Sequence, residues 1–125
     1  MASEHAVVLF AHGARDPRWA EPLHALRTAL QARMPASAVG TAFLELQAPA
    51  LGQALEDLGT AGVRRIDILP VFWGIGGHVA TDLPALVDRF RADHPAVAVT
   101  VLPVLSDLPG MIDFIAEAVS VAARG

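Results

Sequence analysis

Four short apolar runs, each followed by a segment with helical spacing, constrain the fold of this chain more than any other feature. The runs are Ala6–Ala11, Val39–Leu46, Ile66–Phe72 and Val97–Val104. Continuous apolar runs of this length are typical of parallel strands that are covered on both faces. With right-handed crossovers, the order βαβαβαβα predicts a three-layer α/β/α domain with a four-stranded parallel sheet.

Capping residues and apolar spacing predict the four helices. The expected first residues or caps are Asp16 with Pro17, Pro49, Thr81 or Asp82, and Ser106 or Asp107. The first helix has an apolar stripe formed by Trp19, Leu23, Leu26 and Leu30. Pro70 marks the point where the third strand ends or bends. The last helix is apolar enough, with Phe114 beside Ile115, to serve in core packing or in a subunit interface.

Composition limits the size and chemistry of the protein. Its 125 residues suffice for a single domain, 1–125, and the 54% of hydrophobic residues exclude disorder and suggest a buried subunit interface. The chain has no cysteine and no lysine, which excludes thiolate metal sites, cysteine nucleophiles and Schiff-base chemistry. A net charge of −4 argues against nucleic-acid binding, and no run is long enough to span a membrane. We therefore expect a cytoplasmic protein without nucleic-acid or membrane partners.

The candidate site lies at the carboxyl ends of the strands, where ligands bind in folds of this class. His12 follows the first run, Glu45 stands at the end of the second, and His78 ends a glycine-rich loop after the third. Two imidazoles and a carboxylate suit Co²⁺, Fe²⁺, Ni²⁺ or Zn²⁺. Three protein ligands would leave one coordination position open for chemistry.

Each of these residues also has an ordinary structural interpretation. His12 could hydrogen-bond the backbone of a turn, and Glu45 could pair with Arg15. The glycines Gly74, Gly76 and Gly77 allow either close approach to a flat ligand or merely a turn. Trp73 could stack on an aromatic ligand or pack in a core or interface. We interpret His5, His24 and His94 as surface residues.

Three collinear motifs nevertheless resemble the sirohydrochlorin chelatase family, class II. They are Leu9–Pro17, which contains His12-Gly13-Ala14-Arg15; Phe43-Leu44-Glu45 followed by Pro49; and Pro70–Pro84, which contains Trp73 and His78. Together they cover the chain from the first strand to the third helix. The length resembles the short, single-domain cobaltochelatase form of the family. The resemblance implies a chelatase-like fold with flavodoxin-like winding and the strand order 2-1-3-4.

The resemblance also implies the function and the roles of the residues. It implies ATP-independent insertion of a divalent metal, Co²⁺ first and Fe²⁺ or Ni²⁺ as possible substitutes, into sirohydrochlorin, with no organic cofactor. His12 and His78 would bind the metal, and His12, supplemented by Glu45, would accept protons. The substrate would contact Trp73, Gly74, Ile75, Gly76, Gly77, His78, the Ala48 position and Arg15. Ala48 departs from the family, which commonly has an acidic residue there.

A tetrapyrrole is wide and flat, so one small domain would supply only one wall of its site, and we expect a homodimer. Two other functions remain open. A non-catalytic carrier of metal or tetrapyrrole is compatible with Ala48. A hydrolase or phosphoryl-transfer enzyme that uses His12 as its nucleophile ranks last, because no nucleophile elbow is present.

Overall fold

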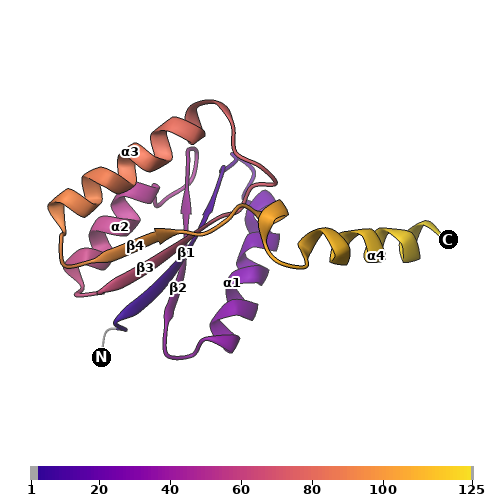
Figure 1. Ribbon diagram of the computed structural model, residues 1–125, viewed down its shortest axis with the longest axis horizontal. Coiled ribbons are helices and arrows are strands. Elements are labelled where there is room, and N and C mark those ends of the chain that lie inside the picture. The colour runs from indigo at the N-terminus through magenta and orange to yellow at the C-terminus, as the bar shows by residue number, and fades with distance from the viewer. Residues whose placement is uncertain (1–2, 125) are drawn as a thin grey trace.

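Residues 3–124 are described by a computed structural model (Figure 1). Its strands are β1 (His5–Ala11), β2 (Ala38–Phe43), β3 (Arg65–Pro70) and β4 (Ala98–Val101). Its helices are α1 (Glu21–Arg33), α2 (Leu51–Thr60), α3 (Gly77–Asp93) and α4 (Met111–Ala123). Short 3-10 turns at Pro17–Ala20 and Leu105–Asp107 precede α1 and α4. None of the helices between residues 3 and 124 combines the length and apolarity that crossing a bilayer demands.

The four strands form one parallel sheet in the order β2-β1-β3-β4, which confirms the predicted class and order. β1 lies in the interior between β2 and β3, in register from His5 opposite Arg65 to Phe10 opposite Pro70. Every residue from Ala6 to Ala11 is at most 5% exposed. That burial on both faces explains why the first run is continuously apolar.

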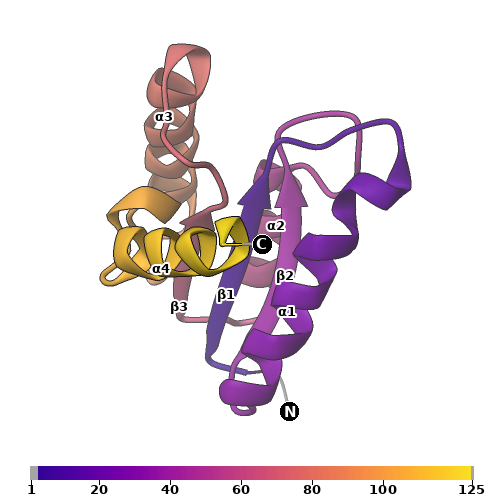
Figure 2. The same cartoon turned by 90° about the vertical axis from the view of Figure 1, so that its right-hand side faces the viewer.

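Helices cover the two faces of the sheet unequally. Val8, Phe10, Ile66 and Ile68 pack with residues of α2 and α3 on one face. Val7 and Leu9 pack with Leu23 of α1 on the other face, and α1 lies over the β1–β2 half. Figures 1 and 2 show α2 and α3 on the side of the sheet opposite α1. Within residues 3–124, the β3–β4 half therefore has no helix against it on the α1 side.

The last helix does not join either layer. α4 packs against the turn Leu105–Asp107, and Figure 1 shows its far end lying clear of the sheet. No side chain of α4, all of whose residues are described, is buried. Core packing, one of the two roles expected for this helix, is therefore not its role within one chain.

Three strands are shorter than the apolar runs predict. β2 ends at Phe43 rather than Leu46, because Leu46 adopts a left-handed φ of 66° and Gln47 N–H bonds back to the Glu45 carbonyl at 2.8 Å. β3 ends at Pro70, as the proline suggested, and β4 ends at Val101. Apolarity thus continues past the strands into loops that are only partly covered.

Helix starts are predicted less well than helix existence. Asp16 does cap the turn before α1, since its carboxylate accepts the Arg18 N–H at 2.9 Å. The hydrogen bonds from Arg18 also lower the pKa of Asp16. The other starts are wrong by two to six residues, because α2 begins at Leu51, α3 at Gly77 and α4 at Met111. Gly76 immediately precedes α3, and Gly110 immediately precedes α4.

Candidate functional site

The loops after β1, β2 and β3 meet at the carboxyl edge of the sheet, and each brings one predicted site residue. His12 follows β1 directly, and Glu45 lies in the loop two residues after β2. His78 is the second residue of α3, not a loop residue as the sequence suggested. The backbone N–H groups at a helix start are free to meet an anion, so His78 stands beside an electropositive edge.

His12 and Glu45 form a hydrogen-bonded pair. The distance from His12 Nε2 to Glu45 Oε1 is 2.9 Å, and both side chains are about half exposed, at 51% and 56%. Glu45 therefore pairs with His12, and not with Arg15 as the structural interpretation of the sequence suggested. A carboxylate accepts hydrogen bonds only, so the neutral ring that donates to it carries its proton on Nε2 and keeps a lone pair on Nδ1. The pair thus presents one basic ring nitrogen, in an orientation fixed by Glu45.

The backbone around Gly13 makes this pairing possible. Leu44 N–H donates to the Ala11 carbonyl at 2.9 Å, and Glu45 N–H donates to the His12 carbonyl at 3.0 Å. Gly13 adopts a φ of 96°, and any Cβ at this position would collide with the Glu45 carbonyl oxygen. Gly13 is therefore the residue that lets the two loops approach closely enough for their side chains to bond.

A further side chain holds the same two loops together. The amide oxygen of Gln47 accepts the backbone N–H of Ala14 at 3.0 Å. The loop after β2 is thus attached to the loop after β1 in two ways. The backbone N–H groups of Leu44 and Glu45 bond the first loop, and so does the side chain of Gln47. This doubly bonded arrangement holds the His12–Glu45 pair on a fixed frame.

An open hollow of about 590 Å³ lies over the pair. It is lined by His12, Leu44, Glu45, Phe72, Gly74, Ile75, Gly76, His78, Val79 and Asp82. Six of the predicted site residues, from three separate segments, therefore share one surface. Trp73, Gly77, Ala48 and Arg15 do not line the hollow; Trp73 is 54% exposed beside it, and the other three are also exposed.

The structure does not assemble all three expected metal ligands. Across residues 3–124, no three carboxylate or imidazole groups stand close enough together to hold a metal ion between them. His12 and Glu45 are in contact, whereas His78 faces the same hollow from α3 without joining them. A metal bound to both histidines would therefore draw further ligands from elsewhere, such as a bound molecule in the hollow.

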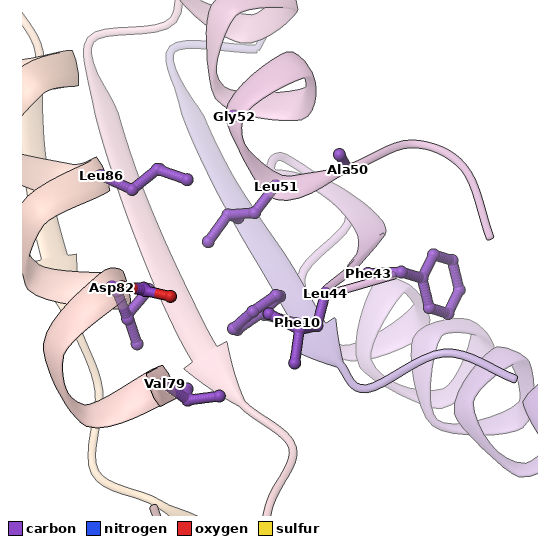
Figure 3. Close-up of a pocket in the computed structure, with 10 residues that line it drawn as sticks. Phe10, Phe43, Leu44, Ala50, Leu51, Gly52, Val79, Asp82 and Leu86 are labelled. Carbon is purple, nitrogen blue, oxygen red and sulfur yellow. The ribbon is translucent and has the colours of Figure 1, made fainter. Parts of the chain in front are cut away.

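Asp82 is a residue of the hollow that the sequence reasoning missed. The sequence pattern indicates a helix cap at Thr81 or Asp82, but Asp82 lies one turn after His78 inside α3, on the same side of the helix. The spacing of four between His78 and Asp82 was the available signal. Asp82 also borders a smaller, almost wholly apolar cavity of about 110 Å³. Figure 3 shows Asp82 and Val79 extending from α3 toward Phe10 and Leu44 in this cavity.

Two histidines that were interpreted as surface residues instead tie elements together. His5 is 15% exposed and bonds Ser37 at 2.7 Å and Asp67 at 2.6 Å. His94 stacks on Phe90 and bonds Glu56 at 2.9 Å. Neither faces the hollow, and His24 is exposed on α1. Of the five histidines, His12 and His78 line the hollow, and His5 and His94 have structural partners that the sequence did not indicate.

Comparison with known proteins gives a consistent family assignment. A family model described as CbiX matches residues 6–122. The sirohydrochlorin cobaltochelatase of Methanocaldococcus jannaschii is 32% identical over 89 residues, which is 71% of this chain and 62% of that protein. The same enzyme of Methanococcus maripaludis is 26% identical over 70% of this chain and 61% of its own length. The chain thus spans about three fifths of the length of these curated relatives.

Solved structures agree with the fold. A CbiX protein from Marinobacter aquaeolei VT8 superposes with a TM-score of 0.80 at 26% identity, covering 96% of this chain and 98% of that one. The sirohydrochlorin chelatase SirB from Bacillus subtilis subspecies spizizenii, solved in complex with cobalt, gives a TM-score of 0.68 at 23% identity. That match covers 82% of this chain and 44% of SirB, and at this identity it supports the fold.

Proposed function

Because this chain belongs to the CbiX family, we propose that it inserts a divalent metal ion, Co²⁺ first, into sirohydrochlorin without ATP. The observation that carries this proposal is the His12–Glu45 pair at the open hollow, which His78 faces from the first turn of α3. The names of the curated relatives support the same substrate class. We also propose that residues 1–125 act as one domain.

The reaction requires a base as well as a metal ligand. Two pyrrole N–H bonds break, two protons leave, and the metal exchanges water for the macrocycle nitrogens. In this proposal His12 Nδ1 first holds the metal, and once the metal has passed to the macrocycle the same nitrogen accepts a proton from the substrate while Glu45 holds the ring through Nε2. Since the His12 side chain is 51% exposed, the proton then passes to solvent. Glu45 stabilises the imidazolium that forms in between.

His78 and Asp82 supply the other half of the chemistry. In this proposal His12 and His78 bind the metal, and the macrocycle nitrogens supply the remaining ligands that the protein does not. Asp82, one turn after His78, is the carboxylate placed to accept the second proton. It would perform the acidic role that Ala48 cannot, since an alanine carries no titratable group.

The glycine loop provides a surface for a flat ligand. Gly74, Ile75 and Gly76 line the hollow, and the glycine pair leaves the backbone free of side chains that would hold a macrocycle away. The first turn of α3 and the exposed guanidinium of Arg15 offer positive partners for substrate carboxylates. Arg18 is less available, because its guanidinium bonds Asp16 at 2.7 Å. Trp73, Gly77 and the Ala48 position complete the proposed contact surface at its rim.

The hollow is open on one side, and a tetrapyrrole needs more than one wall. We propose that a second copy of the chain supplies the other wall, so that the working form is a homodimer.

The proposal is tested with purified protein, sirohydrochlorin and Co²⁺, by following the absorbance change of the macrocycle against the rate without protein. We expect His12→Ala and Glu45→Gln to lower the rate about 10²-fold or more, as the loss of a general base does. His78→Ala should weaken the apparent affinity for Co²⁺. His24→Ala, on the exposed side of α1, is the matched control and should leave the rate unchanged. A wild-type rate in His12→Ala would contradict the proposal.

A non-catalytic carrier is the second candidate, and Ala48 is the observation that favours it. A carrier would bind sirohydrochlorin or Co²⁺ in a stoichiometric amount without raising the insertion rate above the background.

The preferred metal is tested by repeating the insertion assay with Fe²⁺ and Ni²⁺ in place of Co²⁺. Two imidazoles accept all three ions, so the measured rates rank them.

A further inference from the structure

The two outer strands of the sheet, β2 and β4, lie in segments without a single charged residue. No Asp, Glu, Lys or Arg occurs from residue 34 to 44 or from residue 95 to 106. The segment Val97–Leu102, which contains β4, has four β-branched residues in six and neither glycine nor proline. Such segments at the edge of a sheet are the ones that pair with a strand of another chain. Lysine often protects sheet edges, but this chain has none.

Alternate residues of each outer strand present their backbone N–H and C=O groups to the open edge. In β4, Ala98 N–H donates toward β3, to the Arg64 carbonyl at 2.8 Å, so Val99 faces outward. In β2, Leu44 N–H likewise donates toward β1, and the same alternation places Val39 on the outer edge. The groups of Val39 and Val99 are therefore the ones that an added strand would bond.

The side-chain amide of Gln31 occupies the place of a peptide group in a fifth strand. Its oxygen accepts the Val39 N–H at 3.1 Å, and its nitrogen donates to the Ser37 carbonyl at 2.7 Å. In a parallel pair, one residue of the neighbouring strand bonds the carbonyl of one residue and the N–H group two residues later. Ser37 and Val39 have this separation, so Gln31 satisfies both groups as an added strand would.

Arg27 occupies the next position along the same edge. Its Nε donates to the Val39 carbonyl at 2.9 Å. Arg27 and Gln31 are four residues apart on the same side of α1, which lies along β2 (Figure 2). At the other end of β2, Phe43 N–H donates to the Pro49 carbonyl at 2.9 Å. The chain itself therefore closes the outer edge of β2 at both ends.

Arg91 of α3 closes the outer edge of β4 in a similar way. Its Nη2 donates to the Val99 carbonyl at 2.6 Å, while Nη1 donates to Asp88 at 3.2 Å. Because β4 has only four residues, one donor at Val99 interrupts its short edge. In both outer strands the arginine comes from the helix that directly precedes the strand.

We propose that Arg27, Gln31 and Arg91 are edge-closing residues, which keep a strand of a second copy of this chain from extending the sheet. The strand that they exclude is Val97–Leu102, because every other copy carries this uncharged, β-branched segment. An incoming strand would have to displace hydrogen bonds from charged guanidinium groups, which are stronger than those between neutral groups. This role requires neither a metal nor a tetrapyrrole, so it stands independently of the proposed function.

The edge of β4 is tested with Arg91→Met, which removes the donor but keeps most of the apolar stem. Arg89→Met, at an exposed position of α3, is the matched control with the same change in charge. The measurement is the protein concentration at which light scattering exceeds the wild-type mass and thioflavin T fluorescence rises. We expect this threshold to fall about tenfold in Arg91→Met, the factor that corresponds to one hydrogen bond of a charged donor. The control should match the wild type, and an equal threshold in Arg91→Met would overturn the proposal.

A second substitution separates pairing at the edge from partial unfolding. Val101 is 37% exposed on β4, so Val101→Lys adds a charge to the strand without restoring the bond to Val99. We expect Arg91→Met/Val101→Lys to regain the wild-type threshold, because lysine on an edge strand opposes pairing. A variant that associates because it is less stable would not be rescued, and failure of the rescue would contradict edge pairing. Urea unfolding of each variant measures its stability independently.

The edge of β2 is tested by hydrogen exchange, at a concentration where every variant keeps the wild-type mass. In Gln31→Met the Val39 amide loses its acceptor, and we expect it to exchange at least about tenfold faster. The Leu44 amide, which bonds the Ala11 carbonyl within the sheet, should keep its rate. Gln53→Met is the control, since Gln53 bonds only Asp57 of its own helix among the described residues. An unchanged rate at Val39 would remove Gln31 from the edge-closing residues.

Discussion

At the residue scale, the candidate site depends on a glycine rather than on the side chains that would perform the chemistry. Gly13 has a φ of 96° and faces the Glu45 carbonyl oxygen, with no room for a Cβ. Residues other than glycine are strained in this conformation, and here the added methyl group also separates the two loops. His12 and Glu45 are therefore held at 2.9 Å by a residue that contributes no functional group.

We predict that Gly13→Ala lowers the free energy of unfolding by about 1–3 kcal/mol and reduces the rate of metal insertion, because the added methyl group moves His12 away from Glu45. Urea unfolding measures the first effect, and the insertion assay under conditions where the variant is fully folded measures the second. Gly40→Ala is the control, because no atom lies within 4 Å of a Cβ placed there. Equal effects of the two substitutions would contradict the role given to Gly13.

The residues of the site were predictable to different extents. His12 and Glu45 were found because they follow apolar runs, and loops after parallel strands converge at one edge. Asp82 was missed because its interpretation depended on where the helix begins. When the helix starts at Gly77, a residue expected to cap it instead lies one turn inside it and faces the hollow. Glycine-rich segments give little information on helix starts, since glycine permits many backbone conformations.

At the scale of the elements, a cluster at the opposite edge of the sheet holds three strands together. His5 of β1 bonds Asp67 of β3 at 2.6 Å and Ser37, just before β2, at 2.7 Å. The His5 and Asp67 side chains are only 15% and 20% exposed. Polar groups with so little access to water cost free energy when they lose their partners.

We predict that Asp67→Asn lowers the free energy of unfolding by about 1–3 kcal/mol and leaves the insertion rate of the folded protein unchanged, because the cluster lies far along the strands from His12. Asp88→Asn serves as the comparison, since its pair with Arg91 lies on the exposed side of α3 and should contribute within about 0.5 kcal/mol. Denaturant unfolding of both variants measures the difference. If Asp67→Asn unfolded at the same free energy as the wild type, the cluster of His5, Ser37 and Asp67 would not stabilise the sheet.

The elements themselves were predicted well, and their placement less well. The parallel sheet follows from right-handed crossovers and local apolar runs, which the sequence contains, whereas the strand order was implied by the resemblance to the chelatase family. The position of α4 is a different kind of property, because its apolar residues are equally compatible with its own sheet and with another chain. Helical spacing indicates that a face must be covered, but it does not identify the cover. His5 and His94 show the same limit, since their partners are more than thirty residues away.

At the scale of the whole molecule, a loop and a helix start that are distant in sequence bring two imidazoles to one hollow. His12 and His78 are separated by two strands and two α-helices of chain, yet both line the same surface. The other three histidines, His5, His24 and His94, lie elsewhere and serve as internal references. The chain therefore contains its own controls for metal binding.

The most direct measurement is an NMR titration of the five imidazole side chains with Co²⁺, whose unpaired electrons shift and broaden the signals of nuclei close to the ion. We predict that the His12 and His78 signals change first and together, at the same Co²⁺ concentration, while those of His5, His24 and His94 keep their positions. A response of His12 without His78, or a first response at one of the three reference histidines, would contradict a shared metal site.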